Sequence, residues 1–254
     1  MRSRLLIPIF VLTSFGASVH ADPFKPSVKQ QIELGQKAAD QVRKREKVLK
    51  DSDERVRFLR RVASKLMAAM PEKERQTWQF SFDVIDSKEV NAFALPGGPT
   101  FFYTGLLDKL KTEDELAGIL GHELVHTRNQ HWASAYADNQ KRRLGITAIL
   151  TILRAKDIVW DLASIGDDLI FGLPYSRRHE TDADMIGLKN MVDAGYNPAG
   201  MANVFRMLSQ QGGKPPEFLS THPEDKNRVK KIEDEAAKMN RTFPPLKPLP
   251  WAKD

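Results

Sequence analysis

The sequence predicts an α+β fold that is mainly α, with one small β-sheet packed on a central helix. Apolar residues recur every three to four positions over most of the chain, which is typical of amphipathic helices. One group of short alternating segments between residues 78 and 104 is typical of strands. The chain has 254 residues and is 41% hydrophobic and 28% charged, a globular composition that excludes a disordered or low-complexity protein.

Residues 1–21 have the pattern of a secretory signal peptide. Two arginines precede an apolar stretch at residues 5–12, and Val19-His20-Ala21 offers small residues at the expected cleavage positions. The apolar stretch is shorter than the roughly 20 residues of a membrane-spanning helix, which favours cleavage over a retained anchor. We therefore expect an exported, periplasmic protein with a single domain over residues 22–242.

The first part of this domain predicts helices over residues 26–70. Between Val56 and Met70 the apolar residues follow three-and-four spacing and form one helix face. The basic run at residues 43–50 lies on the preceding helix, and we interpret it as a solvated face rather than a partner site.

Three short extended segments follow these helices. Residues 78–84 alternate between apolar and polar, residues 90–95 end at a Pro-Gly-Gly turn, and residues 100–104 stop at Gly105. Three strands joined by turn signals predict one small sheet.

A new helix is predicted to begin after Thr112. The segment Thr-Glu-Asp-Glu is a capping box, in which Glu115 reaches back to the N-cap. The apolar run at residues 144–153 is too short to span a bilayer and predicts a core helix, although a role at a membrane surface stays open. The later segments predict helices at 180–193 and 199–210, a loop at 210–223, a basic helix, and an extended Pro-rich tail at 243–254.

The chain contains no cysteine, which restricts its chemistry. Disulfides, thiolate metal sites, a cysteine nucleophile and an acylated lipoprotein cysteine are all excluded. Any metal ion must therefore be held by His, Asp or Glu. The net charge of +6 is weak evidence for nucleic acid, and we expect no nucleic-acid partner.

Residues 122–126 read His-Glu-Leu-Val-His on the helix that follows Thr112. Histidines four residues apart project from one helix face, so both imidazoles can bind the same metal ion. Glu123 lies to one side, where its carboxylate can meet a water on that ion. Both histidines adjoin an apolar stripe, which favours a metal site over two histidines without a metal.

A catalytic zinc site needs a third protein ligand and an open fourth position. His131 follows the second histidine by five residues, which on a continuous helix turns it about 140° away, so we expect a structural role. Glu180 and Asp184 share a later helix face, where one could bind the metal and the other accept the spare N–H of a ligand histidine. His179 is the rival for the third position, and an ordinary charged helix start is the alternative for this segment.

Four segments, in this order, resemble peptidase family M48, the zinc metallopeptidases that include HtpX-type enzymes and the membrane proteases of prenylated CAAX proteins. These segments are Asn91-Ala-Phe-Ala before a Gly-Gly turn, Gly121-His-Glu-Leu-Val-His126, Arg177-x-x-Glu180-x-x-Ala183-Asp184, and Ser220-Thr-His-Pro223 with Arg228. They cover more than half of the chain that follows residue 21. The chain is most similar to the exported, soluble or peripheral bacterial members.

The resemblance implies a zincin-like metallopeptidase domain with one zinc ion (Zn2+) per chain. The implied roles are zinc ligand for His122, His126 and Glu180, general base for Glu123, support of a ligand histidine for Asp184, a position over the open side of the metal for His222 and Arg228, and substrate contact for Asn91. His222 or Arg228 would stabilise the negative charge that develops on the substrate carbonyl.

The resemblance also implies hydrolysis of peptide bonds by a zinc-activated water, with Glu123 as general base. The expected substrates are unfolded or misfolded polypeptides of the cell envelope, which could pair as an added strand with residues 91–95. We also hypothesise that His222, on a loop with several Gly and Pro residues, swings in to fill the fourth zinc position and silences the enzyme.

Two functions of other classes stay open at this point. The first is a non-catalytic binding or chaperone-like module that keeps the fold, and the second is a membrane-surface protein that works through residues 144–175. The complete ligand set and the base Glu123 favour the enzyme. Peripheral membrane contact is left open, and no oligomeric state is predicted.

Overall fold

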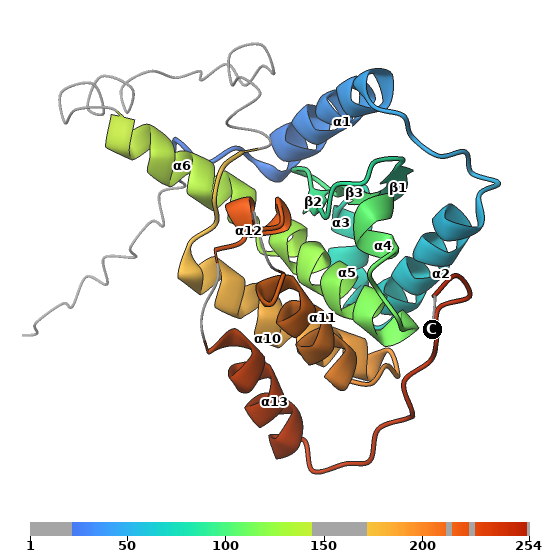
Figure 1. Cartoon of the computed structure of the whole chain (residues 1–254). Helices are drawn as coiled ribbons and strands as arrows, with labels where there is room; N and C mark the ends of the chain where they lie inside the picture. Colours follow the sequence, from blue (N-terminus) through green and yellow to red (C-terminus); the bar gives the residue numbers. More distant parts are fainter. Residues whose placement is uncertain (1–21, 144–171, 212–214, 224–226, 253–254) are drawn as a thin grey trace, which may run out of the picture.

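The computed structural model describes residues 22–143, 172–211, 215–223 and 227–252. Its elements in chain order are α1 (Val28–Arg45), α2 (Glu54–Ala68), α3 (Glu72–Thr77), β1 (Ser81–Ile85), β2 (Ala92–Ala94), β3 (Pro99–Tyr103), α4 (Thr104–Leu107), α5 (Glu113–Arg128), α6 (His131–Arg143), α10 (Arg177–Asp193), α11 (Ala199–Ser209), α12 (Phe218–Thr221) and α13 (Arg228–Lys238). Figure 1 shows α5 in the middle of the molecule, with the sheet on one side and α10 and α11 on the other. The predicted α+β, mainly α fold is confirmed, with a small sheet against the histidine-bearing helix.

Helix α5 begins where the capping box predicts. The Thr112 hydroxyl accepts the N–H of Glu115, and the Glu115 carboxylate accepts the N–H of Thr112. Every residue from Asp114 to Thr127 is buried. A helix buried on all sides must find partners for each of its polar groups, since an unpartnered polar group is costly away from water.

Two glycines let α5 and α10 cross at very short range. A Cβ atom added to Gly187 would lie 3.0 Å from the carbonyl carbon of Gly121 and 3.0 Å from the backbone nitrogen of His122. Any larger side chain would force the helices apart, so the backbones themselves are in contact here. This contact places the acidic face of α10 directly beside the first histidine of α5.

The sheet has the order β1-β3-β2, with β1 and β3 parallel and β2 and β3 antiparallel. β2 therefore lies at an edge. Strand β1 starts at Ser81 rather than at residue 78, because its partner in β3 begins at Pro99 and the chain before it turns at Gly97 and Gly98, both with positive φ. Residues 72–77, just ahead of the predicted strand, form α3, whose first turn holds two glutamates as helix starts favour.

The side chains of β3 alternate between two apolar clusters, as the period of a strand requires. Phe101 packs in a cluster with Leu34 and Ala38 of α1, whereas Phe102 belongs to the main core built from α2, α5, α10 and α11. The basic run on α1 is engaged in ion pairs, since Arg43 lies 2.8 Å from Asp83. The sequence predicts a solvated face for this run, whereas Arg43 pairs with a buried carboxylate, and α1 ends at Arg45, before the last lysines of the run.

The Pro-rich segment after residue 242 packs against the domain instead of leaving it. It contains no helix in its described residues, as predicted, and pairs with the start of α5 through a bridge between Thr112 and Pro248. Leu249 is buried in the main core, and the Trp251 ring meets Phe58 edge-on with centroids 5.1 Å apart. The domain therefore extends past the predicted boundary at residue 242.

Other expectations from the sequence fall in or near less regular segments. Residues 218–221 form the short helix α12 inside the segment predicted as a loop. The predicted signal peptide at residues 1–21 and the apolar run at residues 144–153 lie outside the described residues. In the described ranges, no helix combines the length and the apolar character that a membrane crossing requires.

Candidate metal centre

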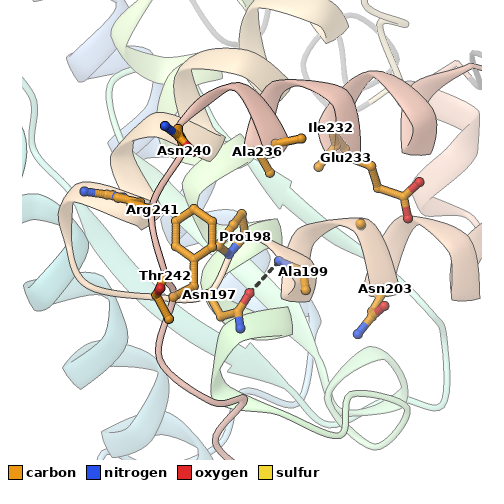
Figure 2. A pocket seen from close by; sticks show the side chains of 13 residues that line it. Asn197, Pro198, Ala199, Asn203, Ile232, Glu233, Ala236, Asn240, Arg241 and Thr242 are labelled. Carbon is orange, nitrogen blue, oxygen red and sulfur yellow. Dashed lines mark hydrogen bonds between the residues drawn. The ribbon is translucent and has the colours of Figure 1, made fainter.

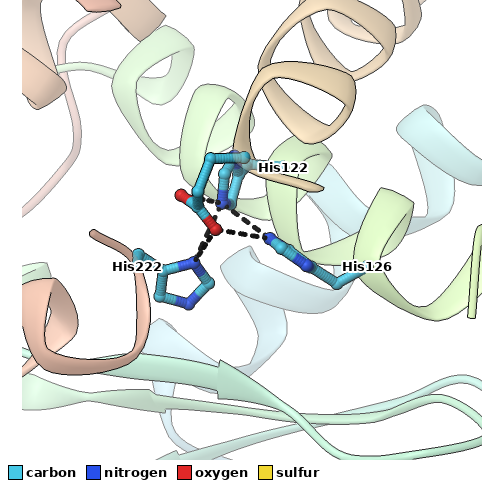
Figure 3. A group of neighbouring side chains, drawn as sticks. His122, His126 and His222 are labelled. Atoms are coloured by element: carbon cyan, nitrogen blue, oxygen red, sulfur yellow. Dashed lines mark hydrogen bonds and ion pairs between the residues drawn. The ribbon is translucent and has the colours of Figure 1, made fainter. Parts of the chain in front are cut away.

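Four side chains from three elements meet beside the middle of α5. His122 and His126 come from α5, Glu180 from α10, and His222 directly follows α12. One ligand atom from each of the four lies within 4.8 Å of every other, and all four residues are buried. Figure 3 shows the His122, His126 and His222 rings turned toward one another. We call these four residues the ligand cluster.

The distances in the ligand cluster are those of atoms that point at a common centre. His126 Nε2 lies 2.9 Å from His122 Nε2, and His222 Nδ1 lies 3.1 Å from the same atom. Glu180 Oε1 lies 3.1 Å from His222 Nδ1 and 3.5 Å from His126 Nε2. One nitrogen of each ring and the carboxylate therefore face the same small volume.

Burial determines the charge state of the two α5 histidines. It lowers the pKa of His122 and of His126 well below the usual value of an imidazole. Both rings are therefore neutral and keep a lone pair, which is the form that binds metal ions. Glu180 is also buried, but the nearby His222 and His122 outweigh this cost and lower its pKa, so it stays ionised.

Asp184 and Arg228 form a second layer behind the ligand cluster. Asp184 Oδ1 lies 2.9 Å from His122 Nδ1 and accepts a 2.6 Å hydrogen bond from Arg228 Nη2. Arg228 Nη1 lies 3.3 Å from Glu180 Oε2, and the guanidinium carbon lies 3.5 Å from the centroid of the Phe205 ring. With its proton on Nδ1, His122 presents the bare Nε2 to the cluster, as a metal ligand must.

Arg228 was expected over the open side of the metal, and the structure places it in ion pairs with the two carboxylates of α10. This position favours a role in holding Asp184 and Glu180. Its role as a donor to the substrate stays a prediction.

Glu123 is completely buried next to the ligand cluster. Neither of its carboxylate oxygens has a hydrogen-bond partner among the described residues, and Oε1 lies 3.4 Å from His222 Nε2. Burial raises the pKa of Glu123 to about 7, against the opposing pull of His222. A buried carboxylate without a partner is rare in folded proteins and points to a group kept for a ligand or a reaction.

His222 lies inside the ligand cluster, whereas the sequence predicts a position on a loop over the open side of the metal. Burial by itself would lower its pKa, but the charges of Glu180 and Glu123 outweigh burial and raise it. Its ring stacks on Phe218 with centroids 4.2 Å apart, so α12 holds the ring in place.

His131 is the residue that reasoning from the sequence misplaced. Its Nδ1 lies 3.1 Å from Nδ1 of His126, although a continuous helix would turn it away. The reason is that α5 ends at Arg128 and α6 begins at His131, after Gln130 in a left-handed conformation with φ of 55°. No glycine or proline marks this helix end, so the sequence gives little sign of it. His131 faces the outer nitrogen of His126 and is not a member of the ligand cluster.

The ligand cluster fits a zinc ion. Imidazoles in their neutral form and a carboxylate are ligands that zinc binds in proteins, and the cluster offers three imidazoles and one carboxylate. Glu180 Oε2 is buried and makes no hydrogen bond to a described residue beyond its 3.3 Å ion pair with Arg228, so the carboxylate can still bind a cation. His179 does not compete for the third ligand position, since its ring stacks on His131 with centroids 4.5 Å apart and not on the cluster.

Asn91 lies immediately before the edge strand β2. Its backbone carbonyl accepts the N–H of Tyr103, and its side chain donates to Glu89. It lines a cavity of about 390 Å³ together with Phe93, Tyr103 and Thr221. A narrower space shares Phe93 and Thr221 with this cavity and also touches His222, so the β2 edge leads toward the ligand cluster.

Another cavity lies away from the ligand cluster. It has a volume of about 580 Å³, and Figure 2 shows Asn197, Ala199 and Asn203 on one side of it and Ile232, Glu233 and Ala236 on the other. None of its lining residues belongs to the ligand cluster, to Glu123 or to the second layer.

Comparison with known proteins agrees with this geometry. A family model described as "Peptidase family M48" matches residues 53–236. The mitochondrial metalloendopeptidase OMA1 of Arabidopsis thaliana is 35% identical over 179 residues, which are 70% of this chain and 36% of that protein. A putative beta-barrel assembly-enhancing protease of Vibrio cholerae is 29% identical over 181 residues, 67% of this chain and 37% of that protein.

A further relative, the beta-barrel assembly-enhancing protease of Escherichia coli strain K12, is 28% identical over 173 residues, 63% of this chain and 35% of that protein. The chain thus spans little more than a third of the length of these three relatives. The similarity covers the whole region from α2 to α13, which includes the ligand cluster, Glu123 and the second layer.

Proposed function

The chain belongs to peptidase family M48, and on that premise we propose that it is a zinc-dependent endopeptidase that hydrolyses peptide bonds in unfolded polypeptides. The observation that carries the proposal is a buried set of four metal-ligating atoms next to a buried carboxylate that has no hydrogen-bond partner among the described residues. A non-catalytic binding module would have no use for the buried, unpartnered Glu123, whose burial is costly to the fold.

We assign His122, His126 and Glu180 as the zinc ligands, with Asp184 as the support of His122. Zinc supplies Lewis-acid chemistry, since it polarises a carbonyl and lowers the pKa of a bound water. Asp184 accepts the outer N–H of His122 and thereby fixes both the tautomer and the orientation of the ring. Arg228 holds the Asp184 carboxylate in place and offsets its charge.

Glu123 is the proposed general base. It accepts a proton from the attacking water as the new carbon–oxygen bond forms, and it donates that proton to the leaving amine as the carbon–nitrogen bond breaks. The carboxylate lies within ion-pair distance of His222, with Oε1 3.4 Å from Nε2, and no other charged side chain of the ligand cluster pairs with its oxygens.

The substrate is proposed to bind as an extended chain along the edge strand β2, near Asn91. An edge strand offers backbone N–H and C=O groups to an added strand, which gives affinity with little selection of sequence. This mode suits unfolded or misfolded proteins of the cell envelope. Residues 1–21 favour export to the periplasm, and extraction of membranes with carbonate tests whether the protein is also membrane-associated.

The described arrangement is proposed to be a silent state of the enzyme. With His222 the cluster offers four protein ligands, which fill a tetrahedral zinc site, whereas a catalytic site keeps one position open. His222 would have to leave before a water or a substrate carbonyl can enter. Once displaced, it could donate a hydrogen bond to the developing negative charge, the role expected from the sequence.

The variant His222→Ala tests this brake. If His222 blocks the fourth position, its removal should raise the rate of casein cleavage several-fold, because water and substrate can then reach the zinc ion without prior displacement of the ring. Thr77→Ala is the control, since Thr77 lies in α3 and belongs neither to the ligand cluster nor to the cavities at the β2 edge. Unchanged or lower activity of His222→Ala on every substrate tested would contradict the brake.

The central experiment is cleavage of unfolded casein by the wild type and by Glu123→Gln. The variant should lose cleavage while it still binds one zinc ion per chain, because the amide cannot accept the proton but leaves the ligand cluster intact. A chelator should abolish wild-type cleavage, and zinc should restore it. Retained cleavage by Glu123→Gln would overturn the proposed mechanism, and zinc binding without any cleavage by either the wild type or His222→Ala would favour the binding module.

A further inference from the structure

The two histidines of α5 differ in what holds their outer nitrogen atoms. His122 Nδ1 meets the carboxylate of Asp184 at 2.9 Å, the arrangement expected from the sequence. His126 Nδ1 meets instead another imidazole, with Nδ1 of His131 at 3.1 Å. His131 is buried, and its ring centroid lies 4.9 Å from that of His126, with the ring planes at 79°.

The direction of this hydrogen bond follows from the ligand cluster. His126 Nε2 points to the common centre of the cluster, 2.9 Å from His122 Nε2, so it must carry a lone pair to bind a metal ion. A neutral imidazole has one proton, which then sits on Nδ1. His126 is therefore the donor and His131 Nδ1 is the acceptor.

We propose that His131 is a positioning residue that holds His126 in the Nδ1–H tautomer and in the orientation that zinc binding requires. This inference rests on the proposed function, because it assumes that the ligand cluster binds zinc. It gives each α5 ligand its own backing acceptor, a carboxylate for His122 and a neutral imidazole for His126. A ligand histidine that loses such a partner typically loses about 10- to 100-fold in metal affinity.

The chain is built to place His131 there. Helix α5 stops at Arg128, and the left-handed Gln130 interrupts the helix so that the His131 side chain, at the start of α6, faces His126. Gln130 is itself tied down, because its side-chain oxygen accepts a 3.0 Å hydrogen bond from Gln31 of α1. A non-glycine residue at positive φ is uncommon and persists where the surrounding structure holds it.

Aromatic rings that stack on His126 and His131 restrict the rotation of both imidazoles. His179 stacks on His131 with centroids 4.5 Å apart and planes at 14°. Tyr175 stacks on His126 with centroids 3.9 Å apart and planes at 26°. Each imidazole of the hydrogen bond is therefore packed by its own stacking partner, so neither ring can turn without losing a contact.

The test measures the zinc dissociation constant of the full-length protein by competition with a chelator, without reference to activity. His131→Phe keeps a ring that can stack on His179 but removes the acceptor, and we expect the dissociation constant to rise about 10- to 100-fold. His131→Asn places an oxygen where Nδ1 stood and should restore affinity to within a few-fold of the wild type. His131→Gln places its oxygen where Nε2 stood and should not restore it.

His179→Phe is the control for packing, since His179 stacks on His131 but makes no hydrogen bond to His126 among the described residues. It should keep zinc affinity near that of the wild type, and the thermal stability of all apo variants should agree within a few degrees. Equal loss of affinity in His131→Phe and His179→Phe, or equal affinity of His131→Phe and the wild type, would overturn the inference. A wild type that binds zinc tightly but cleaves nothing would contradict the proposed function and not this assignment.

Discussion

Each half of α5 contains a buried carboxylate, and the two carboxylates differ in their hydrogen bonds. Near the N-terminal end, Asp114 accepts the backbone N–H groups of Asn197 at 2.7 Å and of Lys247 at 2.9 Å. In the other half, Glu123 is at least as deeply buried, and neither of its oxygens has a partner among the described residues.

This difference separates a carboxylate that builds the fold from one that is kept for chemistry. A buried acid with a hydrogen bond at each oxygen ties segments together, here the turn before α11 and the Pro-rich segment after α13. A buried acid without partners is costly to the folded state and stays reactive. Each prediction below acts on one half of α5 and should leave the property of the other half unchanged.

The largest effect is expected at the reactive half. Glu123→Gln should lower casein cleavage by about 10²- to 10⁴-fold, the usual contribution of a general base. The free energy of unfolding should not fall, since the substitution removes a buried charge and breaks no hydrogen bond to a described residue. Activity assays and thermal unfolding of the same preparation check both parts. A variant that is inactive only because it unfolds would remove the contrast between the two halves.

Zinc should stabilise the protein through this half only. At a free concentration 100 times its dissociation constant, a ligand that binds only the folded state adds about 2.7 kcal/mol to the free energy of unfolding. Chelation should remove this gain, as measured by thermal unfolding with and without zinc. His126→Ala serves as the control and should show little response to zinc. A zinc response that survives in this variant would place the ion outside the ligand cluster.

Asp114→Ala should lower the free energy of unfolding by about 2–3 kcal/mol, because it leaves two backbone N–H groups without an acceptor. Asp114→Asn keeps an acceptor for one of them and should lose less. Cleavage per folded molecule should match that of the wild type. Denaturant unfolding checks the prediction, with Asp193→Ala as the control, since its exposed pair with Lys189 contributes at most about 0.5 kcal/mol.

The smallest effect concerns the N-cap of the same helix. Thr112→Ala removes the acceptor of the Glu115 N–H and should lower the free energy of unfolding by about 1 kcal/mol. Thr112→Ser retains the hydroxyl and should behave like the wild type. Denaturant unfolding distinguishes the two variants. A loss of zinc affinity in Thr112→Ala would show that the two halves of α5 are coupled.

The parts of the molecule that could be predicted from the sequence depend on local rules. The capping box at Thr112 marks the start of α5 at the correct residue, because the interaction joins residues three apart. The same regularity puts His122 beside His126 and Glu180 beside Asp184, and the structure brings both pairs together. Their roles remain predictions, since the position of four groups does not establish what each one does.

The parts that could not be predicted depend on contacts between distant segments. The Pro-rich segment packs on α4 and α5, and Trp251 donates a hydrogen bond to the Leu107 carbonyl. The sequence of this segment has no periodicity from which such packing could be predicted. The start of β1 is determined by where its partner begins, at Pro99. His131 was assigned to the wrong direction because the helix end at Arg128 depends on the left-handed Gln130, which Gln31 helps to hold from α1.

The contact between Gly121 and Gly187 has a consequence for the size of the ion that the site can accept. Because the backbones of α5 and α10 touch there, no side chain can adjust the spacing between the helix with two ligand histidines and the helix with Glu180. The main chain at this crossing therefore fixes the helix spacing from which the ligand side chains must reach the ion. A redesign for a larger cation would begin at Gly121 and Gly187, which are not metal ligands, and would widen the helix crossing before any ligand is changed.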